Sequence, residues 1–155
     1  MRLNLDCVRD LMLWAEEITT PTKSAVYIDV DILDRTRFMY LRESEIPQPD
    51  EAQNELLSKY PNEVLVYHLT YCINAGLLSP AINQDSCALV IQDLTPEGHN
   101  FLANIRSPKA FSMLKKVLKA LEIESLSAAS RIAQAIVLEI IKKGLENPNL
   151  VQNIF

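Results

Sequence analysis

The stretch that decides the fold is residues 62–78, NEVLVYHLTYCINAGLL. Its apolar side chains recur at steps of three and four residues, which predicts a helix over residues 62–75. We expect Asn62 to cap the start of this helix, and Gly76 to supply the left-handed residue that commonly follows a helix end. The two leucines after the glycine begin an extended segment, so a helix followed by a strand is predicted.

The segment after this helix predicts a β-hairpin followed by another helix. Residues 77–94 contain two apolar runs separated by a polar tip, Asn83-Gln84-Asp85-Ser86. The sequence LTPEGHNFL follows at residues 94–102, and its Thr-Pro pair is typical of an N-cap with proline at the first helical position. Upstream, Asp50 is the expected N-cap of a helix that ends near residue 60. Two helices, a hairpin and a further helix form the pattern of a winged helix-turn-helix.

Helices are also expected at both ends of the chain. An amphipathic helix is predicted over residues 4–18, with Asn4 as its N-cap. Ser107-Pro108 starts a helix to about residue 122. A last helix over residues 126–143 is expected to end at Gly144.

The segment between the first helix and the helix pair predicts a small amount of β structure. Residues 25–31 alternate apolar and polar side chains, which predicts a short half-buried strand. Residues 34–45 fit either a second strand or a short helix. The predicted fold class is therefore mainly α with a small β component, a winged helix-turn-helix core plus C-terminal helices. We expect a winged-helix domain at residues 1–106 with an inserted strand region at about 24–46, and a C-terminal helical extension at 107–155 that serves as an oligomerisation element.

Three sequence pieces carry a family resemblance. They are the opening LNLDCVRD at residues 3–10, the AGL at the end of the central helix, and the LTxxGxxFL form of residues 94–102 with the Ile105-Arg106 that follows. In this order, over roughly residues 1–120, they resemble the YjcQ-like proteins, a bacterial family that is often carried by prophages. The resemblance implies a winged-helix fold and assigns no catalytic or binding residue.

Charge is distributed unevenly along the chain. Residues 1–60 hold seven basic and twelve acidic side chains, residues 61–105 hold four acidic and no basic ones, and residues 106–155 hold eight basic and four acidic ones. The chain opens on polar residues without a signal-peptide pattern, and its most apolar stretch, residues 132–141, is too short to span a bilayer. Three cysteines without CxxC spacing indicate free buried thiols. We therefore expect a cytoplasmic protein without a membrane partner.

The outer face of the helix over residues 62–75 is the expected partner-binding surface. On a helical wheel Glu63, Tyr67, Thr70 and Asn74 cluster opposite the apolar face. Affinity for DNA comes mainly from neutralising phosphates, and neither this helix nor the hairpin contains a lysine or arginine. The sequence therefore favours a non-enzymatic regulatory protein that binds a protein partner through this neutral-to-acidic helix and the wing.

A DNA-binding transcriptional or phage regulator is the alternative. Its nucleic-acid surface would be the helix over residues 108–122, which carries Lys109, Lys115, Lys116 and Lys119 on one side. The same lysines are also explained as the solvent-exposed face of an amphipathic helix. Because residues 61–105 contain no lysine or arginine, the charge distribution disfavours nucleic acid as the partner.

The last helix predicts oligomerisation. Its apolar stripe includes Ile132, Ile136 and Ile140, and so wide a face on a terminal helix must be covered. Either it packs on the first helix of its own chain, or it pairs with the same helix of a second copy. A homodimer is the favoured expectation.

No residue set predicts an active site, a metal site or a cofactor. Asp29, Asp31 and Asp34 lack the companion residues of a phosphotransferase or a calcium loop, and a solvent-facing acidic edge explains them better. The two histidines have no paired ligands, and His68 is expected to be a satisfied histidine at the margin of the core. Acidic neighbours raise the pKa of Cys7 and make it a poor nucleophile.

Overall fold

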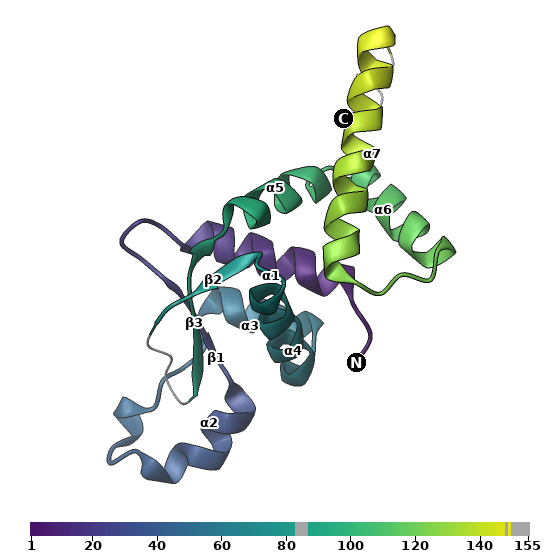
Figure 1. Ribbon diagram of the computed structural model, residues 1–155. Coiled ribbons are helices and arrows are strands. Elements are labelled where there is room, and N and C mark those ends of the chain that lie inside the picture. Colours follow the sequence, from purple (N-terminus) through teal and green to yellow (C-terminus); the bar gives the residue numbers. More distant parts are fainter. Residues whose placement is uncertain (83–86, 148, 150–155) are drawn as a thin grey trace.

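The computed structural model describes residues 1–82, 87–147 and 149 (Figure 1). The described chain is mainly helical with one small antiparallel sheet, which confirms the predicted fold class of helices with a small β component. Its helices are α1 (Leu5–Ile18), α2 (Val30–Thr36), α3 (Glu51–Lys59), α4 (Asn62–Asn74), α5 (Pro96–Ile105), α6 (Pro108–Ala120) and α7 (Leu126–Glu146), with 3-10 turns at Arg37–Met39 and Glu43–Glu45.

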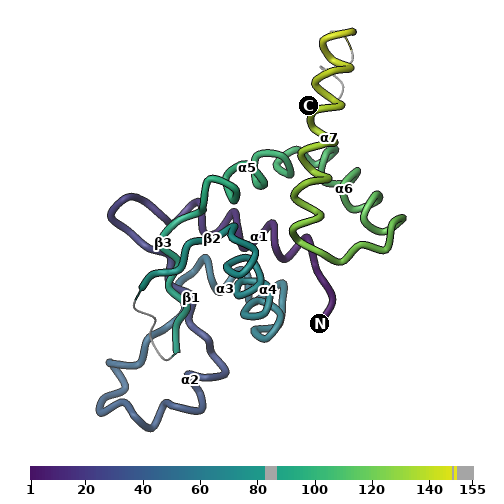
Figure 2. The backbone as a smooth tube through the Cα atoms, viewed as in Figure 1, coloured from purple at the N-terminus to yellow at the C-terminus, as the bar shows by residue number. Residues whose placement is uncertain are grey.

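The sheet has the strand order β1-β3-β2, with β1 at Ala25–Ile28, β2 at Leu78–Pro80 and β3 at Ala88–Leu94. Strands β2 and β3 form the predicted hairpin, in which Leu78 pairs with Leu94. Its expected polar tip at residues 83–86 lies outside the described residues. Strand β1 joins the free side of β3, where Ala25 pairs with Ile91. The sheet therefore connects residues 25–28 with residues 88–91, which are far apart in the sequence (Figure 2).

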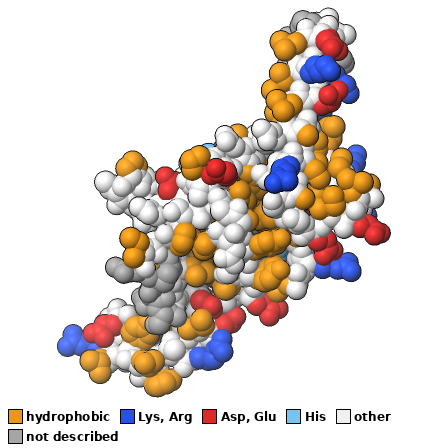
Figure 3. All heavy atoms as spheres, in the orientation of Figure 1, with side chains coloured by type: hydrophobic (Ala, Val, Ile, Leu, Met, Phe, Trp, Pro, Cys, Tyr) orange, Lys and Arg blue, Asp and Glu red, His pale blue; other side chains and the backbone are white. Residues whose placement is uncertain are grey.

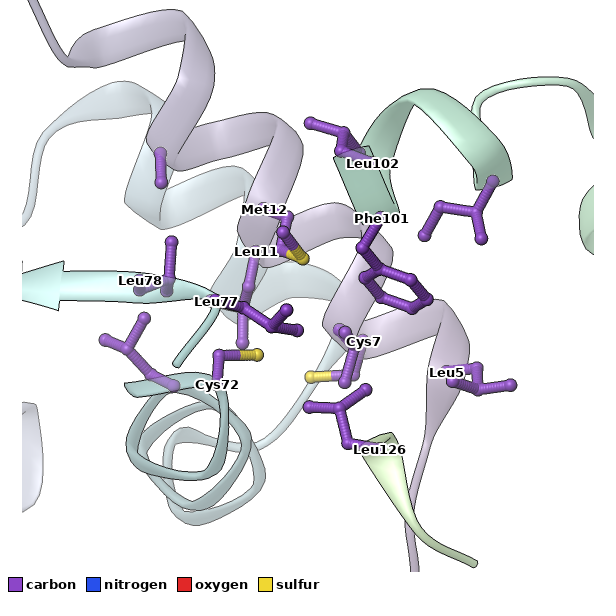
Figure 4. Close-up of a cluster of buried hydrophobic side chains, with 14 of the residues drawn as sticks. Leu5, Cys7, Leu11, Met12, Cys72, Leu77, Leu78, Phe101, Leu102 and Leu126 are labelled. Carbon is purple, nitrogen blue, oxygen red and sulfur yellow. The ribbon is translucent and has the colours of Figure 1, made fainter. Parts of the chain in front are cut away.

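The main hydrophobic core surrounds α1, which lies between α5 on one side and α3 and α4 on the other (Figures 1 and 2). Leu11 and Met12 of α1 are fully buried and point toward Cys72 of α4 and Phe101 of α5 (Figure 4). Leu126, at the start of α7, enters the same core. Burial of these apolar side chains is the dominant favourable contribution to folding.

Side-chain caps start most of the helices at the predicted positions. The N-caps of α1, α3 and α5 accept the backbone N–H three residues ahead at 3.1, 2.7 and 3.0 Å, and these caps are Asn4, Asp50 and Thr95. Ser107 caps α6 in the same way. Gly76 ends α4 with a φ of +73°, as its left-handed role requires.

The prediction that Asn62 caps α4 is wrong. Asn62 is the first helical residue, and the cap position before it is Pro61, which makes no side-chain capping bond. The Asn62 amide instead donates to Asp29 at 2.9 Å and to Asp31 at 2.8 Å, and its oxygen accepts a bond from the Tyr27 hydroxyl at 2.8 Å. These contacts with a distant segment satisfy the amide, so it is not available to the helix start.

The predictions for the inserted region, about residues 24–46, are partly wrong. The strand expected over residues 25–31 ends at Ile28, because Asp29 caps α2 by accepting the backbone N–H groups of Asp31 and Ile32. Of the two alternatives left open for residues 34–45, the helical one is correct, because this segment contains helical turns and no strand. Asp29 is only 9 % exposed, so a solvent-facing acidic edge is not its role.

The last helix also differs from its prediction. It continues through Gly144, which is buried, and ends at Glu146, where the backbone N–H of Asn147 donates to the Lys143 carbonyl. Within the chain α7 packs against α6 and α5, not mainly against α1 as the within-chain alternative expected. The distal part of α7 projects away from the rest of the molecule (Figure 1).

Candidate interaction surface

The outer face of α4 brings together the four residues that the sequence predicted for partner binding. Glu63, Tyr67, Thr70 and Asn74 are all exposed, while Leu65, Leu69 and Cys72 on the opposite face are buried in the core. The helix therefore holds the four side chains on one firmly anchored surface, since its inner face packs in the main hydrophobic cluster.

Tyr67 is the largest side chain on this face. It is 38 % exposed, and its ring stands edge-on to His68 and Tyr71 at centroid distances of 5.1 and 6.0 Å. Its hydroxyl donates to the carbonyl oxygen of Met1 at 3.2 Å. An aromatic side chain held by its neighbours loses little conformational freedom on binding, and tyrosine is enriched among the residues that dominate binding energy.

His68 anchors α4 to the start of α1. The ring is fully buried, and its Nε2 accepts the backbone N–H of Asn4 at 2.9 Å. With Nε2 as acceptor, Nδ1 carries the proton and donates to the Val64 carbonyl at 2.8 Å. Both ring nitrogens therefore have partners, which confirms the prediction of a satisfied histidine.

The α4 helix and the two strands that follow it carry no basic side chain of their own, although Arg2, Lys115 and Lys119 line a hollow beside Val64 and His68. Residues 61–105 contain no lysine or arginine, and Glu63 lies in the first turn of the helix. On the face drawn in Figure 3, basic side chains lie on the α2 segment and toward α6 and α7, with none over the sheet between them. A phosphate backbone approaching α4 would meet no positive charge from these residues.

The lysine-bearing face of α6 is exposed at all four predicted positions, Lys109, Lys115, Lys116 and Lys119. Lys115, however, forms an ion pair with Asp6 of α1, with its Nζ 2.9 Å from one carboxylate oxygen and 3.2 Å from the other. The same ammonium lies 4.8 Å from the centre of the Phe111 ring. This contact neutralises one of the four charges and weakens the face as a phosphate-binding surface.

The three isoleucines predicted for oligomerisation lie along α7. Ile132 and Ile136 are half-buried, and Ile140 is 5 % exposed. All three line a groove between α6 and α7. The structure thus brings them together on one apolar surface that faces α6.

Among the described residues, the burial of the cysteines and the grouping of the acidic side chains bear on chemical reactivity. All three cysteines are buried and unpaired, as expected. Burial, and secondarily the Asp10 carboxylate, raises the pKa of Cys7 to about 12, and burial raises the pKa of Cys72 to about 12 as well. Among the described residues no group of three His, Cys, Asp or Glu side chains could hold a metal ion, and no helix could cross a membrane.

One exposed apolar surface was missed by the sequence reasoning. Phe38, Met39 and Leu41 are 85 %, 69 % and 94 % exposed, although all three are large and apolar. They lie in the region whose secondary structure was left open between strand and helix. The run Phe38-Met39-Tyr40-Leu41, which follows two arginines, is the signal that could have identified them.

The chain resembles a known family and a known protein that carry no assigned function. The chain is 29 % identical over 105 residues to a protein of Haemophilus influenzae (strain ATCC 51907 / DSM 11121 / KW20 / Rd) described as "Uncharacterized protein", which covers 63 % of this chain and 88 % of that protein. No solved structure matches the chain. Residues 2–124 match the family described as "Hypothetical protein (DUF2513)". This agrees with the expectation of a family that assigns no catalytic or binding residue, while neither match bears the YjcQ-like name. The chain belongs to the DUF2513 family.

Proposed function

We propose that the chain is a non-enzymatic regulatory protein of the winged-helix class that binds a protein partner through the outer face of α4 and the β2–β3 hairpin. The element order supports this proposal, because α3 and α4 precede a hairpin whose second strand, β3, lies in the middle of the sheet and pairs with β1. The likeness to the YjcQ-like proteins, an association with prophages and a cytoplasmic location are further parts of the same proposal.

The observation that carries the proposal is the composition of the α4 face. It presents Tyr67 with the polar side chains of Glu63, Thr70 and Asn74, and it is supported from below by a buried apolar face. Protein interfaces are enriched in aromatic residues and are surrounded by polar groups that make hydrogen bonds. A surface without lysine or arginine is compatible with a protein partner and unsuited to a phosphate backbone.

A DNA-binding regulator is the second candidate, and the exposed lysines of α6 favour it. After the pairing of Lys115 with Asp6, three lysines on this face have no ion pair among the described residues, namely Lys109, Lys116 and Lys119. Two copies of the chain would double this number. Binding of this kind would be weak, salt-sensitive and largely independent of base sequence.

Capture of a partner tests the α4 surface. We expect Glu63→Lys and Tyr67→Ser to abolish capture of a co-purifying protein from the native cell while the chain remains folded. Glu51→Lys is the matched control, since Glu51 is also exposed in the first turn of its helix, so both charge reversals have a similar cost of about 0.3–1 kcal/mol at the helix dipole. A partner that both α4 variants retain as well as the control would show that this surface is not the binding site.

Retention of duplex DNA as a function of salt separates the two candidates. The protein-binding proposal expects no retention even at low salt. The DNA-binding alternative expects retention that weakens steeply as salt rises, and it expects Lys116→Glu with Lys119→Glu to remove it. Retention that depends on these lysines would replace the protein-binding proposal with the alternative.

A further inference from the structure

A mainly apolar groove lies between α6 and α7. It has a volume of about 440 Å³ and is lined by six apolar side chains, which are Met113, Val117, Ile132, Ala135, Ile136 and Ile140. Met113 is 45 % exposed, so part of this lining is open to solvent in the isolated chain. An exposed apolar surface that is rimmed by polar groups usually marks an interaction site.

The same pair of helices carries further exposed apolar surface. Leu138 and Ile141, on the projecting part of α7, are 59 % and 48 % exposed, but at about 100° per residue they lie on the side of α7 away from the groove and take no part in the contact proposed below. Figure 3 shows hydrophobic side chains over α6 and the lower part of α7, and again along one edge of the projecting part. The 21 residues of α7 make a helix about 30 Å long at about 1.5 Å per residue, which is long enough to pair with another helix beyond the body of the molecule.

The rim of the groove carries both signs of charge. Lys109 and Lys143 contribute positive charges and Glu139 a negative one, and within the chain the Lys143 ammonium lies 3.8 Å from the Glu139 carboxylate. A nucleic acid or an anionic membrane would favour a rim of lysines alone. Mixed charges suit a self-complementary interface, because a two-fold axis places each patch against an identical one.

We propose that two copies of the chain dock their α6–α7 helix pairs face to face about a two-fold axis and form a four-helix bundle. Met113 of each copy then fills the groove of the other, with the two α7 helices antiparallel. In this arrangement Glu139 faces Lys109 and Lys143 of the partner subunit. Four-helix bundles bury the apolar side chains of their helices in the same way, because the ridges of one helix pair pack into the grooves of the other. The dimer uses a surface separate from the outer face of α4, so either proposal can fail without the other.

Light scattering on the full chain tests the dimer. We expect a mass of twice the chain mass of 17.5 kDa, and we expect Met113→Glu to reduce it to that of a single chain. Met39→Glu is the matched control, because it changes an exposed methionine of a distant segment in the same way and should leave the dimer intact. A single-chain mass for the unmodified protein, or loss of the dimer in both variants, would overturn the proposal.

A charge-swap pair tests the contact between the copies independently of any effect on folding. Glu139→Lys in one chain and Lys109→Glu with Lys143→Glu in another should each weaken the homodimer at least about tenfold. Mixed together, the two variants should form a heterodimer, because opposite charges then face each other only between different chains. If the mixture remains monomeric, the proposed pairing is wrong.

A chain that ends at Asn147 tests the competing occupant, which is the end of the chain itself. We expect this shortened chain to dimerise as the full chain does. If the full chain is monomeric and the shortened one dimeric, residues after 147 fill the groove, and the proposal of a dimer is refuted.

Discussion

Replacement of Gln53 by methionine should destabilise the fold more than its position on a short polar helix suggests. Gln53 is fully buried in α3, and its side-chain amide bonds both backbone groups of Ile28 in β1. Its Oε1 accepts the Ile28 N–H at 2.9 Å, and its Nε2 donates to the Ile28 carbonyl at 2.6 Å. Because β1 is an edge strand, this single amide takes the place of a neighbouring strand.

The expected cost follows from these two bonds. Methionine is similar in length and shape but has no group to satisfy the Ile28 N–H and carbonyl, which would stay buried. Each unsatisfied buried polar group costs about 1–3 kcal/mol, and the gain from burying an apolar side chain offsets part of the sum. We therefore expect the free energy of unfolding to fall by about 2–4 kcal/mol. For a chain of this size that corresponds to a fall in Tm of roughly 5–15 °C.

Urea unfolding followed by circular dichroism measures this loss. Gln134→Met is the matched control, because Gln134 is exposed on α7 and its replacement should change stability by no more than about 0.5 kcal/mol. If Gln53→Met and Gln134→Met unfold at the same urea concentration, the Gln53 amide does not support the edge of β1, and the reasoning is refuted.

Three further predictions concern the packing of the core. Gly98→Ala should lower the free energy of unfolding by about 1–3 kcal/mol, because the added methyl group would overlap the backbone carbonyl of Leu77. This cost should exceed the gain from the better helix propensity of alanine, and an unchanged urea midpoint would contradict the prediction. His68→Phe should cost about 1–3 kcal/mol by leaving the N-cap N–H of α1 without an acceptor, whereas His99→Phe, at an exposed position, should have little effect in the same assay. Burial raises the pKa values of Cys7 and Cys72 from 9.0 to about 12, so the stability that their neutral thiols contribute is complete below pH 9 and is lost as the pH rises toward 12. The unfolding free energy of the native chain should therefore fall more steeply over this range than that of a Cys7→Ala/Cys72→Ala variant, and equal slopes would exclude a role for the thiols.

The helix boundaries and the two faces of α4 were largely predictable from the sequence. Caps such as Asp50 and Thr95 bond a backbone N–H only three residues away, so neighbouring residues suffice to identify them. The faces of α4 follow from the helical period alone, which is why Glu63 and Tyr67 are exposed as expected.

The inserted region was less predictable because its conformation depends on distant partners. Asp29 ends β1 early by capping α2, and it also accepts a bond from Asn62, which lies in another helix. Alternation of apolar and polar residues predicts a strand here but contains no information about this pairing. Asn62 does not cap α4, as its residue type would favour, because its side chain bonds to Asp29, Asp31 and Tyr27.

By itself the sequence determined where most helices begin, which face of each is apolar, and that no basic residue lies between residues 61 and 105, because all three depend on residue type and local spacing. Only the tertiary structure decided that Gln53 supports a strand, that Lys115 is neutralised by Asp6, and that α7 forms an apolar groove with α6. The physical reason is that these features join groups far apart in the chain, whose approach depends on how the core packs and not on any local preference.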